Sequence, residues 1–170
     1  AHAGYILVGV ATGTEFGLAT VVLYLIVYLV TNLSAFGIIS AVSKTLGSDE
    51  IKDYAGLSRR SPGMALAMLV AFLSLTGMPP FAGFIAKPLI FAAAVKADLV
   101  WLAFVGVLNA IIGVYYYLSI LKVVYLYRME GDEEPLPVPQ PYVIALSILS
   151  FGILILGAFF APWFNWSTTA

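Results

Sequence analysis

Lys87 is one of three ionisable side chains in this 170-residue sequence that could carry a proton through apolar surroundings. Uncharged sequence flanks it over residues 61–86 and 88–95. An apolar environment favours the neutral amine over the ammonium form, and a lysine that exchanges its proton readily can act as a relay. The alternative is an ordinary lysine at a helix end, which extends its charged group to nearby water. The spacing alone leaves both interpretations open.

Lys122 and His2 are the other two candidates for a proton relay. Lys122 follows a run of tyrosines, residues 115–117, near the end of a long apolar segment. We expect its ammonium group to extend to the surface, with a role at the entrance of a proton path as the alternative. His2 can titrate near neutral pH, although a lone histidine is more often a packing residue.

Uncharged polar side chains also interrupt the apolar segments. Those that could line a water path are Asn32, Ser34, Asn109 and Tyr116. Asparagine and serine side chains commonly hydrogen-bond neighbouring helices to each other in membranes, and this packing role is favoured here. Tyrosines are typical of the aromatic belt at a membrane interface, which is favoured over a water chain of hydroxyls. With no cysteine and one histidine, the sequence predicts no metal site and no redox cofactor in this chain.

The segment before Lys87 has the composition of a helix break. The residues of this break are Gly77, Pro79, Pro80, Gly83 and Pro88. Prolines lack the backbone donor that a helix needs, so residues 62–96 are predicted to form one discontinuous helix, with Lys87 where its second half begins. Such breaks persist at membrane depth only where protein or a water-filled cavity satisfies the freed backbone groups. A tight hairpin between two short spans is the alternative.

Composition predicts that these residues lie in a lipid bilayer. Hydrophobic residues make up 62% of the chain and charged residues 10%, against about 25% charged in soluble domains. A soluble domain of this size could not bury so much apolar surface. We therefore predict an all-α, polytopic transmembrane helix bundle. The net charge of −1 argues against a partner nucleic acid.

A single membrane domain is predicted from the lengths of the apolar segments, since a spanning helix needs about 20 residues. Its segments are a truncated helix over 1–14, a broken span over 62–96 and continuous spans over 16–43, 99–127 and 141–163. Lysine and arginine are concentrated in residues 44–60 and around 122–128. The positive-inside rule therefore places the loops over 44–60 and 128–140 on the cytoplasmic side and the C-terminus on the periplasmic side. The opening has no methionine and no signal peptide, and is expected to be a cut within a larger protein.

Two stretches of the chain resemble one protein family. They are residues 59–66 (RRSPGMAL) and residues 73–87 (LSLTGMPPFAGFIAK). Together with the opening AHAGY and the tyrosine run, they resemble the N subunit of NADH–quinone oxidoreductase, respiratory complex I, a member of the antiporter-like proton-translocating family. The resemblance covers most of the chain and corresponds to the C-terminal part of that subunit. Pro88 departs from the aromatic or aliphatic residue that usually follows this lysine in the family.

The resemblance implies proton translocation driven by quinone reduction in other subunits, with Lys87 as the lysine of the twelfth helix, on the proton exit side. It implies that NADH, FMN, iron–sulfur clusters and quinone are bound by partner subunits, and that other membrane subunits contact this chain. It also implies a bacterial inner membrane or an organelle equivalent. The alternatives are a subunit of a cation/proton antiporter or a membrane-bound hydrogenase, or a structural membrane scaffold without transport.

Overall fold

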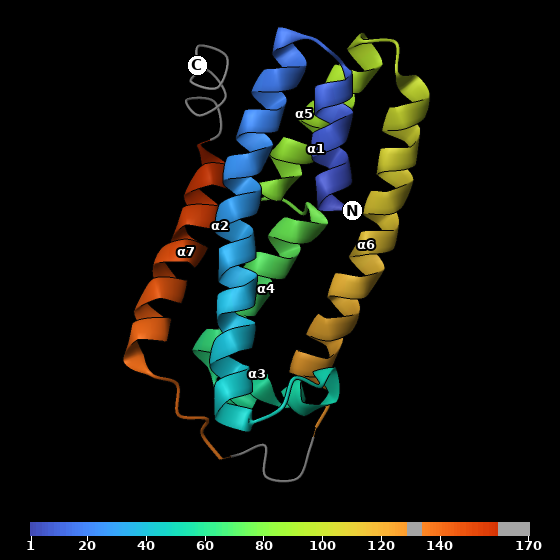
Figure 1. Cartoon of the computed structure of the whole chain (residues 1–170). Helices are drawn as coiled ribbons and strands as arrows, with labels where there is room; N and C mark the ends of the chain where they lie inside the picture. Colours follow the sequence, from blue (N-terminus) through green and yellow to red (C-terminus); the bar gives the residue numbers. More distant parts are fainter. Residues whose placement is uncertain (129–133, 160–170) are drawn as a thin grey trace.

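In the computed structural model, which describes residues 1–128 and 134–159, every regular element is a helix. The elements in chain order are α1 (His2–Ala11), α2 (Glu15–Leu46), the short 3-10 helix η1 (Ile51–Tyr54), α3 (Leu57–Arg60), α4 (Pro62–Thr76), α5 (Gly83–Lys96), α6 (Val100–Leu126) and α7 (Gln140–Ala158). The long helices lie side by side along one common direction (Figure 1). The predicted all-α bundle is confirmed.

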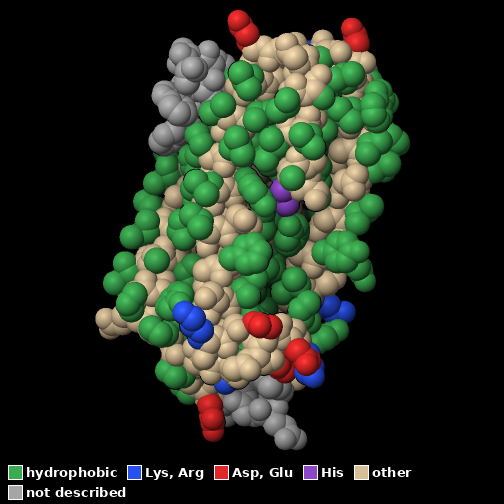
Figure 2. Space-filling model, viewed as in Figure 1, with side chains coloured by type: hydrophobic (Ala, Val, Ile, Leu, Met, Phe, Trp, Pro, Cys, Tyr) green, Lys and Arg blue, Asp and Glu red, His purple; other side chains and the backbone are tan. Residues whose placement is uncertain are grey.

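Three of the described helices, α2, α6 and α7, are long and apolar enough to cross a membrane. They contain 32, 27 and 19 residues, and about 20 suffice to span the hydrocarbon layer. On the face drawn in Figure 2, charged side chains lie at the two ends of the bundle and hydrophobic side chains cover the length between them. The predicted continuation of the last span to residue 163 lies outside the described residues.

The helices α4 and α5 are the two halves of a broken helix. They contain 15 and 14 residues, so each is too short to cross a membrane alone. α4 ends at Thr76 and is followed by Gly77, whose φ of 86° lies in the left-handed region. α5 continues beyond the break in the same general direction (Figure 1). The predicted discontinuous helix is therefore confirmed, and the hairpin alternative is wrong.

Two glycines allow other backbone to approach the break closely. A Cβ on Gly83, the first residue of α5, would overlap the carbonyl oxygen of Ser74 in α4. A Cβ on Gly157 of α7 would overlap the carbonyl oxygen of Pro80. The end of α4, the start of α5 and a turn of α7 are thus in direct backbone contact around the break.

Lys87 lies one turn inside α5, because that helix begins at Gly83. The sequence-based expectation that Lys87 stands where the second half begins is therefore wrong by one turn. Pro88 follows inside the helix without ending it. Its ring has no N–H to donate to the carbonyl group of Phe84 and crowds that carbonyl group, yet α5 continues to Lys96.

Two loops, over 47–61 and 127–139, lie at the same end of the bundle, which we call the loop end. With the adjoining ends of α2 and α6 they carry most of the basic residues. The backbone N–H of Gly56 donates to the carbonyl oxygen of Tyr127 at 3.1 Å, and the N–H of Leu136 donates to that of Arg60 at 2.9 Å. These bonds connect the segment between α2 and α4 to the segment between α6 and α7. α4 therefore starts at this end, and the break lies deep in the bundle.

The close contact at Gly83 predicts a specific loss of stability. We expect Gly83→Ala to lower the stability of the full-length protein by about 1–3 kcal/mol or more, because the added methyl group separates the two half-helices. Gly63→Ala is the control, since a Cβ at Gly63 meets nothing within 4 Å. Thermal unfolding in detergent measures both variants. Equal unfolding temperatures would show that the halves are not in tight contact.

Candidate functional site

Lys87 lies in the interior of the bundle, at the gap between α4 and α5. Its side chain is 7% exposed. Its Nζ donates hydrogen bonds to the carbonyl oxygens of Leu75 at 2.5 Å and Thr76 at 3.1 Å. The carbonyl groups in the last turn of a helix have no partner within the helix, and they form the negative end of its dipole. Lys87 therefore caps the C-terminus of α4 and does not extend to a helix end at the surface.

Two further residues shape the space around the Lys87 amine. Nζ lies 5.5 Å from the centroid of the Tyr5 ring, whose face attracts a cation. A Cβ on Gly77 would lie 3.3 Å from Cδ of Lys87, so the glycine that ends α4 also leaves room for the lysine side chain. The ammonium form thus has two carbonyl partners and one aromatic partner.

His2, at the start of α1, is surrounded by tyrosines. Its Nδ1 lies 2.7 Å from the hydroxyl of Tyr24 in α2, and its Nε2 lies 3.0 Å from the hydroxyl of Tyr117 in α6. Its ring stacks on Tyr28, with centroids 5.1 Å apart. A phenol can donate or accept a hydrogen bond, so both ring nitrogens have partners in either tautomer of the histidine. His2 therefore connects α1 to α2 and α6, with a tyrosine hydroxyl at each of its ring nitrogens.

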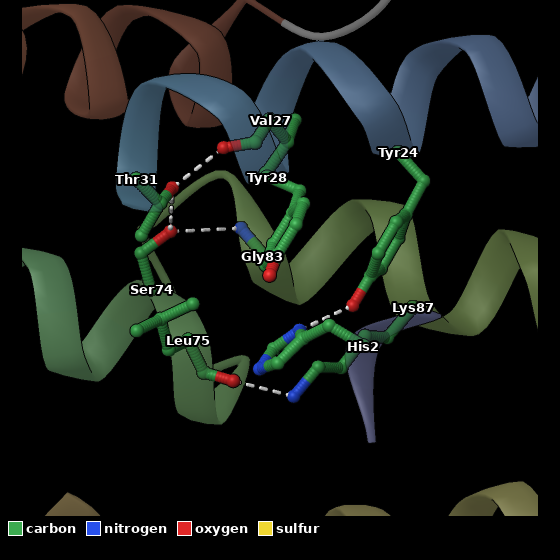
Figure 3. A pocket seen from close by; sticks show the side chains of 9 residues that line it. All are labelled: His2, Tyr24, Val27, Tyr28, Thr31, Ser74, Leu75, Gly83 and Lys87. Carbon is green, nitrogen blue, oxygen red and sulfur yellow. Dashed lines mark hydrogen bonds between the residues drawn. The ribbon is translucent and has the colours of Figure 1, made fainter. Parts of the chain in front are cut away.

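A small cavity lies between His2 and Lys87 (Figure 3). Its volume is about 10 Å³, about the room that one water molecule needs. The residues that line it are His2, Tyr24, Val27, Tyr28, Thr31, Ser74, Leu75, Gly83 and Lys87. Several of these side chains carry polar atoms, so a water molecule there would have the two to four partners that buried waters typically have.

The remaining predicted residues on α6 lie away from this cavity. Lys122 is exposed near the loop end of the helix, with Nζ 5.5 Å from the centroid of the Tyr127 ring. Asn109 is exposed, and its side-chain amide donates to the carbonyl oxygen of Val105 at 2.9 Å. Tyr116 is 63% exposed. The fold does not bring these three side chains to Lys87.

Asn32 and Ser34 occupy different surroundings on α2. Asn32 is half-buried. Ser34 is fully buried, and its hydroxyl has no hydrogen-bond partner among the described residues. Ser34 lies one turn along α2 from Thr31, which does line the cavity, and on the side toward the loop end. Neither Asn32 nor Ser34 lines the cavity itself.

The sequence-based reasoning missed the tyrosines that contact His2. Tyr24, Tyr28 and Thr31 are spaced four and three residues apart, which puts them on one face of α2. This polar stripe in an apolar span was a usable signal. The tyrosine run in α6 carried no such signal, because three consecutive residues point in three directions and only Tyr117 faces His2.

Comparison with known proteins places the chain in a family. Residues 1–113 match the family described as NADH:quinone oxidoreductase/Mrp antiporter, transmembrane. The chain belongs to this family. Its most similar relatives include the NADH-quinone oxidoreductase subunit N of Moorella thermoacetica, 39% identical over 98% of this chain and 35% of the relative. Subunit N of Trichlorobacter lovleyi is 45% identical over 92% of this chain and 32% of the relative. The chain thus spans about a third of the length of the curated relatives it matches.

Two solved structures contain the same arrangement of helices. A chain of respiratory complex I from Thermus thermophilus superposes with a TM-score of 0.81 and 30% identity, over 97% of this chain and 37% of that chain. A chain of the Mrp complex from Dietzia superposes with a TM-score of 0.88 and 23% identity, over 99% of this chain and 40% of that chain. At that lower identity the second match shows the fold alone.

The bond between Tyr117 and His2 yields a prediction that does not depend on transport. We expect Tyr117→Phe to shift the ¹⁵N resonance of His2 Nε2, because the hydroxyl 3.0 Å away is removed. Tyr116→Phe is the matched control on the adjacent, 63% exposed residue. Solid-state NMR of the full-length protein in lipid gives both spectra, and a His2→Gln variant assigns the signal. Equal shifts in the two variants would contradict the contact.

Proposed function

We propose that this chain is part of the N subunit of a respiratory NADH–quinone oxidoreductase and translocates protons across the membrane, with Lys87 as a relay. The observation that carries the proposal is the buried Lys87 amine at the break of a transmembrane helix, beside a cavity shared with His2. Ionisable residues inside membrane proteins are costly and commonly mark ion or proton pathways. The identity of 39–45% with relatives named as subunit N supports this assignment.

The surroundings of Lys87 support both protonation states. The carbonyl groups of Leu75 and Thr76 and the ring of Tyr5 stabilise the ammonium form, and the apolar interior favours the neutral amine. A neutral amine retains two N–H donors and gains one lone pair. It can therefore keep both hydrogen bonds to α4 while its lone pair accepts a proton from the cavity.

His2 is the second relay in this proposal. When the protonated imidazole of His2 donates its proton to the hydroxyl of Tyr24, that hydroxyl would release its own proton into the cavity that it lines together with Lys87, and His2 would be left neutral. The hydroxyl of Tyr117 is the partner of the other ring nitrogen. The unpartnered hydroxyl of Ser34 would extend the path one helical turn toward the loop end. Lys122 lies exposed near that end of α6, where protons would enter. Asn32, Asn109 and Tyr116 would line water only where other parts of the assembly cover them.

The electron-transfer chemistry lies outside this chain in the proposed assembly. NADH, FMN, the iron–sulfur clusters and quinone would be bound by partner subunits, and quinone reduction would supply the drive. Other membrane subunits and the lipid bilayer would surround the bundle. The basic residues Lys44, Arg59 and Arg60 favour the cytoplasmic side for the loop end of the bundle, which puts the C-terminus on the periplasmic side of a bacterial inner membrane or its organelle equivalent.

A cation/proton antiporter subunit is the second candidate, because the matched family includes Mrp antiporters and an Mrp chain has the same fold. The higher identity to subunit N relatives favours the oxidoreductase. Proton translocation that requires NADH oxidation and proceeds without Na⁺ or K⁺ would support the first candidate. Translocation that requires a cation gradient would support the second.

Replacement of Lys87 tests the relay. In the complete complex in proteoliposomes, we expect Lys87→Met to lower NADH-driven proton translocation by about tenfold or more, because a positioned proton donor and acceptor is lost. Lys87→Arg should be equally impaired, because a guanidinium group preserves the cationic cap but does not release its proton. Lys96→Met, at the exposed end of α5, is the control. Normal translocation by an assembled Lys87→Met complex would favour a scaffold role.

A further inference from the structure

A chain of hydrogen bonds connects three helices beside the Lys87 amine (Figure 3). The backbone N–H of Gly83 in α5 donates to Oγ of Ser74 in α4 at 3.2 Å. Oγ of Ser74 lies 3.3 Å from Oγ1 of Thr31 in α2. The Thr31 hydroxyl donates to the carbonyl oxygen of Val27 at 2.7 Å.

The direction of these hydrogen bonds, that is, which group donates in each, follows from the number of hydroxyl protons available. Thr31 has one hydroxyl proton, and the carbonyl oxygen of Val27 accepts it. The oxygen of Ser74 accepts from Gly83, so the Ser74 proton is available for the oxygen of Thr31. The bonds therefore run from Gly83 through Ser74 and Thr31 to Val27, and each donor is used once. Hydrogen bonds aligned in one direction polarise and strengthen one another.

We propose that Thr31 and Ser74 are positioning residues, which hold the start of α5 against the end of α4 and so keep the Lys87 amine on the carbonyl groups of Leu75 and Thr76. Neither side chain needs to exchange a proton for this role. The effect on transport rests on the relay function proposed for Lys87, whereas the effect on the position of its amine does not.

The spacing of the residues explains why this contact controls Lys87. Ser74 immediately precedes Leu75, and Gly83 stands four residues, about one helical turn, before Lys87. The Ser74–Gly83 and Leu75–Lys87 bonds are thus adjacent connections across one gap between the half-helices. If the first is lost, α5 can rotate or withdraw from α4, and the amine at the second moves with it.

Burial prevents outside water from replacing these hydroxyls. Thr31 and Ser74 are each 1% exposed, and the surrounding bilayer offers no hydrogen-bond partners. The N–H of Gly83 belongs to the first turn of α5, whose donors have no partner within the helix. Without the oxygen of Ser74, that N–H loses its acceptor, and the start of α5 is free to move unless a water molecule in the adjacent cavity, which Gly83 also lines, takes the place of the hydroxyl.

The test compares Ser74→Ala and Thr31→Val with the wild type in the complete complex. We expect each variant to lower NADH-driven proton translocation by about threefold or more, because a small displacement of a reacting group has a large effect on rate. The pH dependence of translocation should also be displaced, whereas a simple loss of stability lowers the rate equally at every pH. Thr31→Ser and Ser74→Thr retain the hydroxyls and should restore both properties.

Ser147→Ala is the matched control. Among the residues that the structure describes, its hydroxyl bonds only to the carbonyl oxygen of Val143 in its own helix, on an exposed part of α7. A high-resolution structure of each variant supplies the second measurement, the distance from Lys87 Nζ to the Leu75 carbonyl oxygen. We expect this distance to increase in Ser74→Ala and Thr31→Val and to stay the same in Ser147→Ala. Thr31→Val leaves both groups of the Ser74–Gly83 bond in place but removes the acceptor that orients the Ser74 hydroxyl, so Ser74 can turn away from Gly83. This variant carries the test if Ser74→Ala does not assemble.

The two measurements separate this proposal from the relay function. An unchanged amine position with an unchanged pH profile in Thr31→Val and Ser74→Ala would overturn the positioning role, even if Lys87→Met abolishes transport. A displaced amine with normal transport would establish the positioning role and overturn the relay function.

Discussion

A helix that breaks inside a bilayer must find hydrogen-bond partners for its freed backbone groups within the protein, and this requirement organises the structure around residues 77–82. Hydrocarbon supplies no donors or acceptors, so an unsatisfied carbonyl or amide group would cost several kcal/mol. The Lys87 amine satisfies two carbonyl groups at the end of α4. The hydroxyl of Ser74 satisfies an amide group at the start of α5. Each half of the helix thus supplies the partner that the other half lacks.

This reciprocity makes the same lysine a structural cap and the proposed proton carrier. A residue that only carried protons could be placed in any hydrated gap, and a residue that only capped a helix could remain charged. Lys87 can serve both purposes because an amine keeps two donors after it loses a proton. The helix break therefore does not have to open or refold for the proposed proton exchange to occur.

The cluster around His2 shows how segments distant in the sequence combine into one polar group. α1 supplies the imidazole, α2 supplies Tyr24 and Tyr28, and α6 supplies Tyr117. Aromatic side chains present an apolar body to the core and a hydroxyl to the histidine, so the cluster can be buried without unpartnered polar atoms. His2, Tyr24 and Tyr28 line the same cavity as Lys87, which belongs to a fourth helix, α5.

The sequence by itself determined the fold class and the broken helix, and it identified Lys87 as the candidate residue beside the break. Apolar runs of spanning length, two adjacent prolines between glycines and one lysine in an uncharged stretch are local properties, and local chemistry dictates their consequences. Only the tertiary structure decided which polar residues meet. Tyr117 faces His2 while Tyr116 faces outward, and Ser74 bonds to Gly83 while Asn109 bonds within its own helix. The rotation of each helix about its axis and the overlap of the two half-helices select these partners. Apart from the polar stripe on α2, these spans are apolar on nearly every side, so the residue pattern contains too little asymmetry to specify either property.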